Sequence, residues 1–347
     1  MSSCSQHLTT PSVNRRFAQI TSPLALSSIS LIVEPPRLSI GLFVLSGNPS
    51  IKDWCTTLHF MLQNVHYFVR ATDYLLSQII TLLPRLTTLH IRVQFLARAD
   101  TTSDQTVAAL ASLKHIEDIS FTMVSECTTY STQILRNFAS SIRTLSIHGG
   151  HADWFIGDAS FSESHPFLDG NCNISRPWSF PNLRSLELRN VNREAEIYAQ
   201  IPFDTPLVTL ALSFSTLLRY PTAPCLQRRR VQRLVLWVPI ASIPPKPRAE
   251  HGPSADILDL IVPIESTEDL PLATAFGRLH GFVCSLSDET TRKVTWKMEC
   301  STPELCTKLI EELQEPSIIA ILHSLAAACH EKGLQWELEG PGSLRLK

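Results

Sequence analysis

The sequence predicts an α/β solenoid, with short parallel strands on a concave face, helices or loops on a convex face, and a helical cap at the C-terminal end. Three observations predict this fold class. One short apolar pattern returns along most of the chain, helical periodicity precedes several of its copies, and two joints between helix and strand have the same form. Of the 347 residues, 44% are hydrophobic and 18% are charged, so the chain can bury a large core.

The recurring pattern is an apolar residue, two variable residues, a second apolar residue, one variable residue and a third apolar residue. Successive copies begin roughly 22 to 31 residues apart, with one longer step after Ile142, and such steps are near the lengths of leucine-rich repeats. We therefore expect an irregular leucine-rich-repeat solenoid. The copies are Leu26-Ile29-Leu31, Cys55-Leu58-Phe60, Leu86-Leu89-Ile91, Ile116-Ile119-Phe121, Ile142-Leu145-Ile147, Leu183-Leu186-Leu188, Leu207-Leu210-Leu212, Val231-Leu234-Leu236, Ile257-Leu260-Val262 and Leu279-Phe282-Cys284.

Polar residues alternate with the apolar residues of this pattern. The residue before the middle apolar position is polar in all of the stronger copies, which are those that begin between residues 26 and 231. Such alternation is typical of a strand with one buried face and one solvated face. An ordinary α/β domain with a parallel sheet is the alternative, but its core strands are usually apolar on both faces.

Residues at helical spacing precede several of the expected strands. Asp73 is expected to cap a helix whose apolar side runs through residues 75–83, and Asp104 to cap one with its apolar side in residues 107–111. A shorter stripe lies in residues 134–138. Proline then marks two similar corners from helix to strand, because it cannot continue a helix; the corners are Leu83-Pro84-Arg85-Leu86 and Phe180-Pro181-Asn182-Leu183.

The C-terminal residues differ from the repeats. Ser301-Thr302-Pro303-Glu304 is typical of a helix start, with a capping hydroxyl, a proline in the first turn and an acid near the positive end of the helix dipole. A second helix is expected from Pro316 to a stop at Gly333, followed by a last strand in residues 334–338. We therefore divide the chain into residues 1–24, a solenoid of residues 25–300 with a long insertion near residues 149–178, and a cap of residues 301–347.

Aligned copies of the pattern place their polar positions in three rows along the concave face. The rows mix hydroxyl groups, acids, bases and imidazoles, which suits a protein surface better than a nucleic-acid backbone. The expected partner-binding residues are Thr88, His90, Arg92, Asp118, Ser120, Thr122, Thr144, Ser146, His148, Ser185, Glu187, Arg189, Arg233 and Trp237.

The segment His148-Gly149-Gly150-His151 permits three interpretations. Two histidines with Asp153 nearby could hold a metal, but a third ligand at a fixed spacing is missing. His-Gly-Gly is also found in the oxyanion loop of some esterases, but the sequence has no G-x-S-x-G nucleophile elbow. We favour a glycine turn that leaves a strand. Phosphate-binding glycine loops are missing as well, so we expect no enzyme, no metal and no cofactor.

Charge, hydropathy and cysteine content narrow the partners. The formal net charge is -2 and no long stretch carries one sign, so nucleic acid is not an expected partner. No stretch is apolar over the roughly 20 residues that a membrane helix needs, and the first residues lack the apolar core of a signal peptide. The nine cysteines show no paired spacing, which favours a reducing compartment, the cytoplasm or the nucleus.

Two segments resemble a known family. Val13-Asn14-Arg15-Arg16-Phe17-Ala18-Gln19-Ile20-Thr21-Ser22-Pro23-Leu24, which runs into Ser28-Ile29-Ser30-Leu31, resembles the last part of an F-box and its exit into the first repeat strand of fungal F-box leucine-rich-repeat proteins. The ending Leu334-Gln335-Trp336-Glu337-Leu338 is similar too. In that family the F-box docks on a Skp1-type adaptor of a ubiquitin ligase, and the repeats hold the substrate.

The resemblance implies that another protein is the partner, and that this chain is similar to the substrate-recognition part of a ubiquitin-ligase receptor. Residues 1–24 would then be the remnant of an F-box helix. Because only 12 residues precede Val13, we expect the first half of the F-box, with most of its adaptor contacts, to be missing, either by truncation or by loss of ligase docking. The alternatives are a hydrolase that uses His148-Gly149-Gly150 and a degraded paralogue without a partner. The residues on the adaptor side would be Val13, Arg16, Phe17, Pro23 and Leu24.

Overall fold

A single sheet runs through the whole computed structural model, which describes residues 27–48, 50–62, 70–93, 104–113, 115–123, 135–150, 179–191, 194, 197–198, 201–202, 204–219, 230–239, 254–266, 272–285, 291–340 and 345–346. Within these residues the sheet has 12 strands, and each strand lies beside the next one in the sequence. All neighbours pair in parallel except the last two. The strands are β1 (Ser28–Ile32), β2 (Thr57–Leu62), β3 (Thr88–Val93), β4 (Asp118–Met123), β5 (Thr144–His148), β6 (Ser185–Arg189), β7 (Thr209–Ser213), β8 (Arg230–Trp237), β9 (Ser254–Ile264), β10 (Lys293–Cys300), β11 (Gln335–Glu339) and β12 (Arg345–Leu346).

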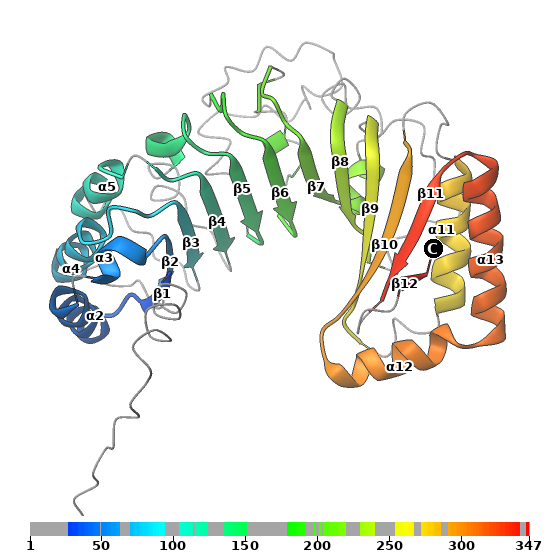
Figure 1. Ribbon diagram of the computed structural model, residues 1–347, viewed down its shortest axis with the longest axis horizontal. Helices are drawn as coiled ribbons and strands as arrows, with labels where there is room; N and C mark the ends of the chain where they lie inside the picture. The colour runs from blue at the N-terminus through cyan, green and yellow to red at the C-terminus, as the bar shows by residue number, and fades with distance from the viewer. Residues whose placement is uncertain are drawn as a thin grey trace, which may run out of the picture.

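The sheet curves into an open arch, and most helices lie on its outer side (Figure 1). At the N-terminal end, α2 packs against α4 and α4 packs against α5; at the C-terminal end, α11 packs against α13. This agrees with the α/β stacking expected from the sequence. The helices are α2 (Pro35–Gly47), α3 (Ser50–Trp54), α4 (Arg70–Thr81), α5 (Asp104–Ala111), α9 (Phe214–Arg219), α11 (Leu272–Ser285), α12 (Pro303–Leu313) and α13 (Pro316–Glu331). No helix in the described ranges is both long and apolar enough to cross a membrane.

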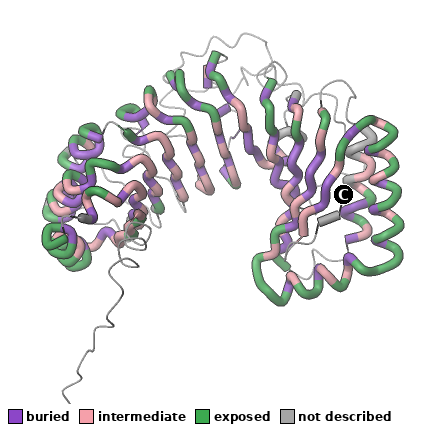
Figure 2. The backbone as a smooth tube through the Cα atoms, in the orientation of Figure 1, coloured by how far each residue is buried: buried purple, intermediate pink, exposed green. Residues whose placement is uncertain are grey.

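The middle apolar residue of the recurring pattern lies in the core in strand after strand. Figure 2 shows the resulting alternation of buried and half-buried residues along the strands. Neighbouring strands bring these side chains into register, so that they form one continuous apolar layer beneath the sheet. The prediction of one buried and one solvated strand face is confirmed for β3 to β6, where Leu89, Ile119, Leu145 and Leu186 are at most 1% exposed and the residues between core positions are half-buried or exposed. From β7 onward parts of the other face are buried as well, as at Ala211 and Asp259.

The last expected copy of the pattern, Leu279-Phe282-Cys284, is wrong. This segment belongs to α11, whose buried residues Leu272, Ala275 and Phe276 have the spacing of three and four that defines a helix face. The strand at this place is β10, which the sequence pattern did not predict. In β10 the first position of the pattern is occupied by Thr291, which is polar, although Val294 and Trp296 alternate as in the other strands.

Helix ends follow local capping chemistry at the C-terminal cap. Thr302 precedes α12, and its hydroxyl accepts a hydrogen bond from the Leu305 amide at 3.3 Å. Gly333 follows α13 with a φ of +66°, the left-handed conformation that ends helices. The predicted helix starts and stop in this region are confirmed.

Asp73 does not cap the helix that it was expected to cap. It lies within the first turn of α4, and its carboxylate accepts hydrogen bonds from the backbone amides of Gln105 and Thr106 at 3.2 and 2.9 Å. The Thr106 hydroxyl also donates to this carboxylate, at 2.6 Å. Asp73 therefore caps α5, the helix of the following repeat, which sequence spacing could not indicate.

Candidate functional site

The polar side chains of the inner strand face form the three rows that the sequence predicts. The first row pairs Thr88 with Asp118, and continues through Thr144, Ser185 and Thr209 to Arg233. The second row runs from His90 through Ser120, Ser146, Glu187 and Ala211 to Val235. The third row joins Arg92, Thr122, His148 and Arg189 on β3 to β6, and Ser213 with Trp237 on β7 and β8.

Most of these side chains are half-buried, as expected of a shallow concave surface, and Arg92 and Arg233 are exposed. Trp237 differs, because it is buried to 6% exposure. The guanidinium of Arg189 lies 5.4 Å from the centre of the Trp237 ring, so the two residues form a cation–π contact with each other. Trp237 therefore offers a partner little surface. The structure brings the other predicted residues to one face, and their role in binding stays a prediction.

Charged residues on the C-terminal part of this face neutralise one another across neighbouring strands. Arg233 on β8 forms an ion pair with Asp259 on β9, whose side chain is buried. Lys293 Nζ on β10 lies 2.7 Å from Glu337 Oε2 on β11, and Lys297 repeats this pairing with Glu339 at 2.8 Å. A cavity of about 580 Å³ at this end is lined by Lys293, Glu337 and part of α13. Its acid and lysine already satisfy each other, so this end of the face has little charge left for a partner.

A cluster of three polar side chains, Ser146, His148 and Glu187, lies at the centre of the face. Glu187 Oε1 lies 2.9 Å from His148 Nε2, and Glu187 Oε2 accepts a hydrogen bond from the Ser146 hydroxyl at 3.2 Å. Burial raises the pKa of the Glu187 carboxyl. The opposite effects of His148, the largest of them, and of Ser146 and Arg189 outweigh burial, so the pKa lies below its usual value. The carboxylate therefore stays ionised and holds both neighbours in place.

This order of contacts bears on the hydrolase alternative. A nucleophilic serine needs the histidine between itself and the acid, so that the imidazole can take the hydroxyl proton. Here the carboxylate lies between serine and histidine. Gly149 and Gly150 follow with φ angles of 72° and 79°, which only glycine adopts easily, so they form a turn that leaves β5.

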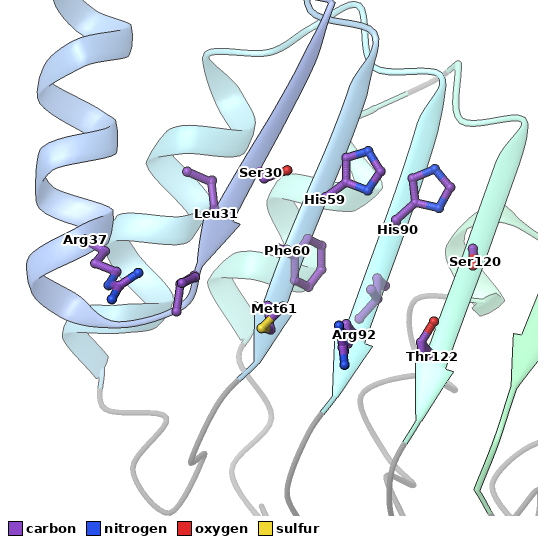
Figure 3. A pocket seen from close by; sticks show the side chains of 12 residues that line it. Ser30, Leu31, Arg37, His59, Phe60, Met61, His90, Arg92, Ser120 and Thr122 are labelled. Atoms are coloured by element: carbon purple, nitrogen blue, oxygen red, sulfur yellow. The ribbon is translucent and has the colours of Figure 1, made fainter. Parts of the chain in front are cut away.

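The N-terminal end of the face contains a second cavity of about 580 Å³ (Figure 3). His59 and His90 lie side by side on β2 and β3, with ring centres 4.3 Å apart and an angle of 12° between the ring planes. Arg92 lies two residues beyond His90 on the same strand face, and Arg37 reaches the cavity from α2. The cavity is lined by Ser30, Leu31, Ile32, Arg37, His59, Phe60, Met61, His90, Ile91, Arg92, Ser120 and Thr122.

Sequence reasoning found only part of this cavity. His90, Arg92, Ser120 and Thr122 are in the predicted rows, but the contributions of β1 and β2 were missed. The sequence pattern did contain these positions, since Ser30 and His59 take the same place in their copies as His90 does in its copy. The observed register agrees, because it pairs Ser30 with His59 and His59 with His90. Extension of the predicted rows from β3 to β2 and β1 would have placed both residues on the concave face. No sequence signal indicates Arg37, which lies on a helix.

Several other predictions concern residues that lie outside those described by the structure. The adaptor-side residues Val13, Arg16, Phe17, Pro23 and Leu24 lie outside the described residues, and so does most of the insertion near residues 149–178. Within the described part of the chain, no group of three histidine, cysteine or acidic side chains could hold a metal ion. Comparison of the chain with protein-family models gives no match, and comparison with curated proteins gives none either.

Proposed function

We propose that this chain is a protein-binding leucine-rich-repeat module, and that its partner covers the concave strand face. The observation that carries the proposal is the set of three in-register rows of polar side chains along one open sheet. Neighbouring strands lie about 4.8 Å apart, so such rows form a continuous, rigid and chemically mixed surface. Mixed surfaces of this kind are typical of protein interfaces.

The distribution of charge favours the N-terminal part of the face. Ion pairs within the fold neutralise Arg233, Lys293 and Lys297. Arg92, by contrast, forms no ion pair with any residue that the structure describes. An unpaired guanidinium on a fixed strand can contribute to binding without first breaking a contact of its own.

The resemblance of residues 13–31 to an F-box exit extends the proposal. The repeats would hold a substrate protein for a ubiquitin ligase, and residues 13–24 would lie on the side that faces a Skp1-type adaptor. Cys55, Cys300, Cys306 and Cys329 are free thiols, which supports a reducing compartment such as the cytoplasm or the nucleus. We propose no catalytic role, because Glu187 separates Ser146 from His148.

Blocking the face tests the binding function. A double variant, Thr88→Arg with Thr144→Arg, places two bulky charges in the first row without touching the core. The matched control is Ser112→Arg with Ser140→Arg, which changes two exposed positions outside the rows. Proteins captured by the wild-type chain are identified by quantitative mass spectrometry, and each is then purified and titrated against the three forms.

A partner of the concave face loses most of its affinity for the row variant and keeps it for the control. If every captured protein binds the row variant as well as the wild type, the concave face is not the binding surface. The ligase role is tested separately, by size-exclusion chromatography of the full chain mixed with a purified Skp1-type adaptor. A complex would support the role, and separate elution would remove it while leaving the binding function.

A further inference from the structure

The N-terminal cavity carries positive charge that its own residues do not neutralise. Arg92 is exposed at its edge and has no acidic partner among the described residues. Arg37 lies 3.1 Å from Glu34, but the two side chains are 58% and 43% exposed, and ion pairs so open to water are weak. The guanidinium of Arg37 can therefore exchange this contact for another anion at little cost.

The inner wall of the cavity presents further donors. Neither His59 nor His90 forms a hydrogen bond with a described residue; the two rings contact each other by stacking. Burial and the neighbouring His59 lower the pKa of His90, with an opposite effect from Asp118, so His90 is mainly neutral at pH 7 and its ring N–H can donate. Ser120 and Thr122 add hydroxyl groups on the next strand (Figure 3).

We infer that this cavity binds a negatively charged side chain, a carboxylate or a phosphoryl group, in an extended segment of the partner protein. The inference rests on the proposed binding function and names the chemistry of its recognition. Guanidinium groups bind the paired oxygens of carboxylates and phosphates in a fixed, bidentate geometry. Imidazole and hydroxyl donors complete such a site, and the half-buried Met61 supplies apolar surface for the carbon stem of the bound residue.

The rows explain why the ligand is a peptide segment rather than a nucleic acid. They continue from the cavity along the face through Asp118 and Glu187, whose carboxylates would repel a phosphate backbone. A peptide can place one acidic residue in the cavity and different residues beside these carboxylates. The cavity volume of about 580 Å³ is within the range of known ligand sites. The cavity can therefore hold the side chains of a few peptide residues.

Selection of short random-sequence peptides against the full chain tests the inference. We expect the enriched peptides to carry acidic residues. Arg92→Gln should weaken their binding about tenfold, because a hydrogen bond to a charged group is lost. Arg143→Gln is the matched control, since Arg143 is an exposed arginine that pairs with Glu117 at 3.2 Å outside the cavity. Asp118→Asn should strengthen binding, because it removes a carboxylate on the neighbouring strand that acts on His90 and would repel a bound anion.

Synthetic versions of an enriched peptide then separate the two anions. Tighter binding with phosphoserine than with glutamate at the key position indicates a phosphoryl group, and the reverse indicates a carboxylate. Enrichment of neutral or basic peptides, or full binding by Arg92→Gln, overturns the inference. Neither result affects the proposed function, because that function is tested with Thr88 and Thr144, which do not line the cavity.

Discussion

Glu194 shows how a single buried carboxylate can connect two segments of the chain. Its side chain is 3% exposed and accepts hydrogen bonds from the Ser213 amide at 2.9 Å, the Ser213 hydroxyl at 2.6 Å and the Thr216 hydroxyl at 2.7 Å. Burial raises the pKa of Glu194, and these three donors offset part of that effect. The carboxylate thus fixes the end of β7 and the start of α9, which follows β7 directly.

Removal of this acceptor should destabilise the protein. We expect Glu194→Ala to lower the free energy of unfolding by about 2 kcal/mol, because buried donors on Ser213 and Thr216 lose their partner. Glu194→Gln keeps one carbonyl acceptor and should cost less. Urea unfolding followed by circular dichroism gives both values. Equal stability of Glu194→Ala and the wild type would contradict the proposed connection.

Cys55 should make the protein sensitive to alkaline pH. This thiol is fully buried, and burial raises its pKa from 9.0 to about 11. Between these two pKa values the unfolded chain releases the thiol proton while the folded chain keeps it. The contribution of Cys55 to the free energy of unfolding is therefore fully present below pH 9 and falls as the pH rises toward 11. Unfolding experiments across this range should show a smaller fall in Cys55→Ala than in the wild type. Parallel curves for the two proteins would show that Cys55 has no such effect.

At the scale of elements, neighbouring repeats are joined by hydrogen bonds as well as by packing. Asp73 on α4 caps α5, and α4 and α5 also pack side by side. The first amides of a helix have no partner within the helix, so a cap supplied by another element stabilises both. The sequence could not predict this contact, because Gln105 and Thr106 lie 32 and 33 residues away from Asp73.

Asp73→Ala should therefore loosen α5 rather than α4. We expect a loss of about 1–2 kcal/mol and faster hydrogen exchange in the first turn of α5, because its amides lose their acceptor. Asp73→Asn, which keeps an oxygen acceptor, is the control and should behave nearly as the wild type. Exchange that accelerates in α4 alone would show that Asp73 acts on its own helix.

Strands and rows could be predicted because both depend on short-range alternation. A strand that alternates places every second residue on one face, and aligned repeats extend each face across the sheet. The pattern failed where it was incomplete, at β10, and where helical spacing imitated it, in α11. In β9 the expected copy Ile257-Leu260-Val262 is two residues out of register, because Ala255, Leu258 and Leu260 pair with the copy in β8 and Ile257 is 36% exposed. It also could not foresee which charges meet, such as Lys293 with Glu337, or that Trp237 is buried. Those facts depend on side-chain packing between strands, which no local spacing encodes.

The whole molecule is one sheet with two different ends. At the C-terminal end, α11, α13 and β11 cover a core that includes Trp296, which is 1% exposed and stacks on Phe276 with ring centres 5.6 Å apart. At the N-terminal end, α2 leaves three large apolar side chains open to solvent, Ile40, Phe43 and Val44. The C-terminal elements thus close the stack in a way that α2 does not.

Deletion of residues 301–347 tests this closing role. The deletion removes α12, α13, β11 and β12, and it exposes both the edge of β10 and the apolar residues beneath it. We expect the shortened chain to aggregate, as seen by light scattering during size-exclusion chromatography. Deletion of residues 341–347, which removes only β12, should leave a monomer. A monomeric, folded chain without residues 301–347 would show that these elements do not cap the stack.

The order of the strands has a consequence for how the chain reaches this structure. Each strand that the structure describes pairs only with those that come just before and after it in the sequence, so the pairing of these strands does not have to wait for a distant segment. Short contact separations favour fast folding. During synthesis on the ribosome, each strand can add to an edge that is already in place, and the sheet can grow at the pace of translation, from β1 toward β11.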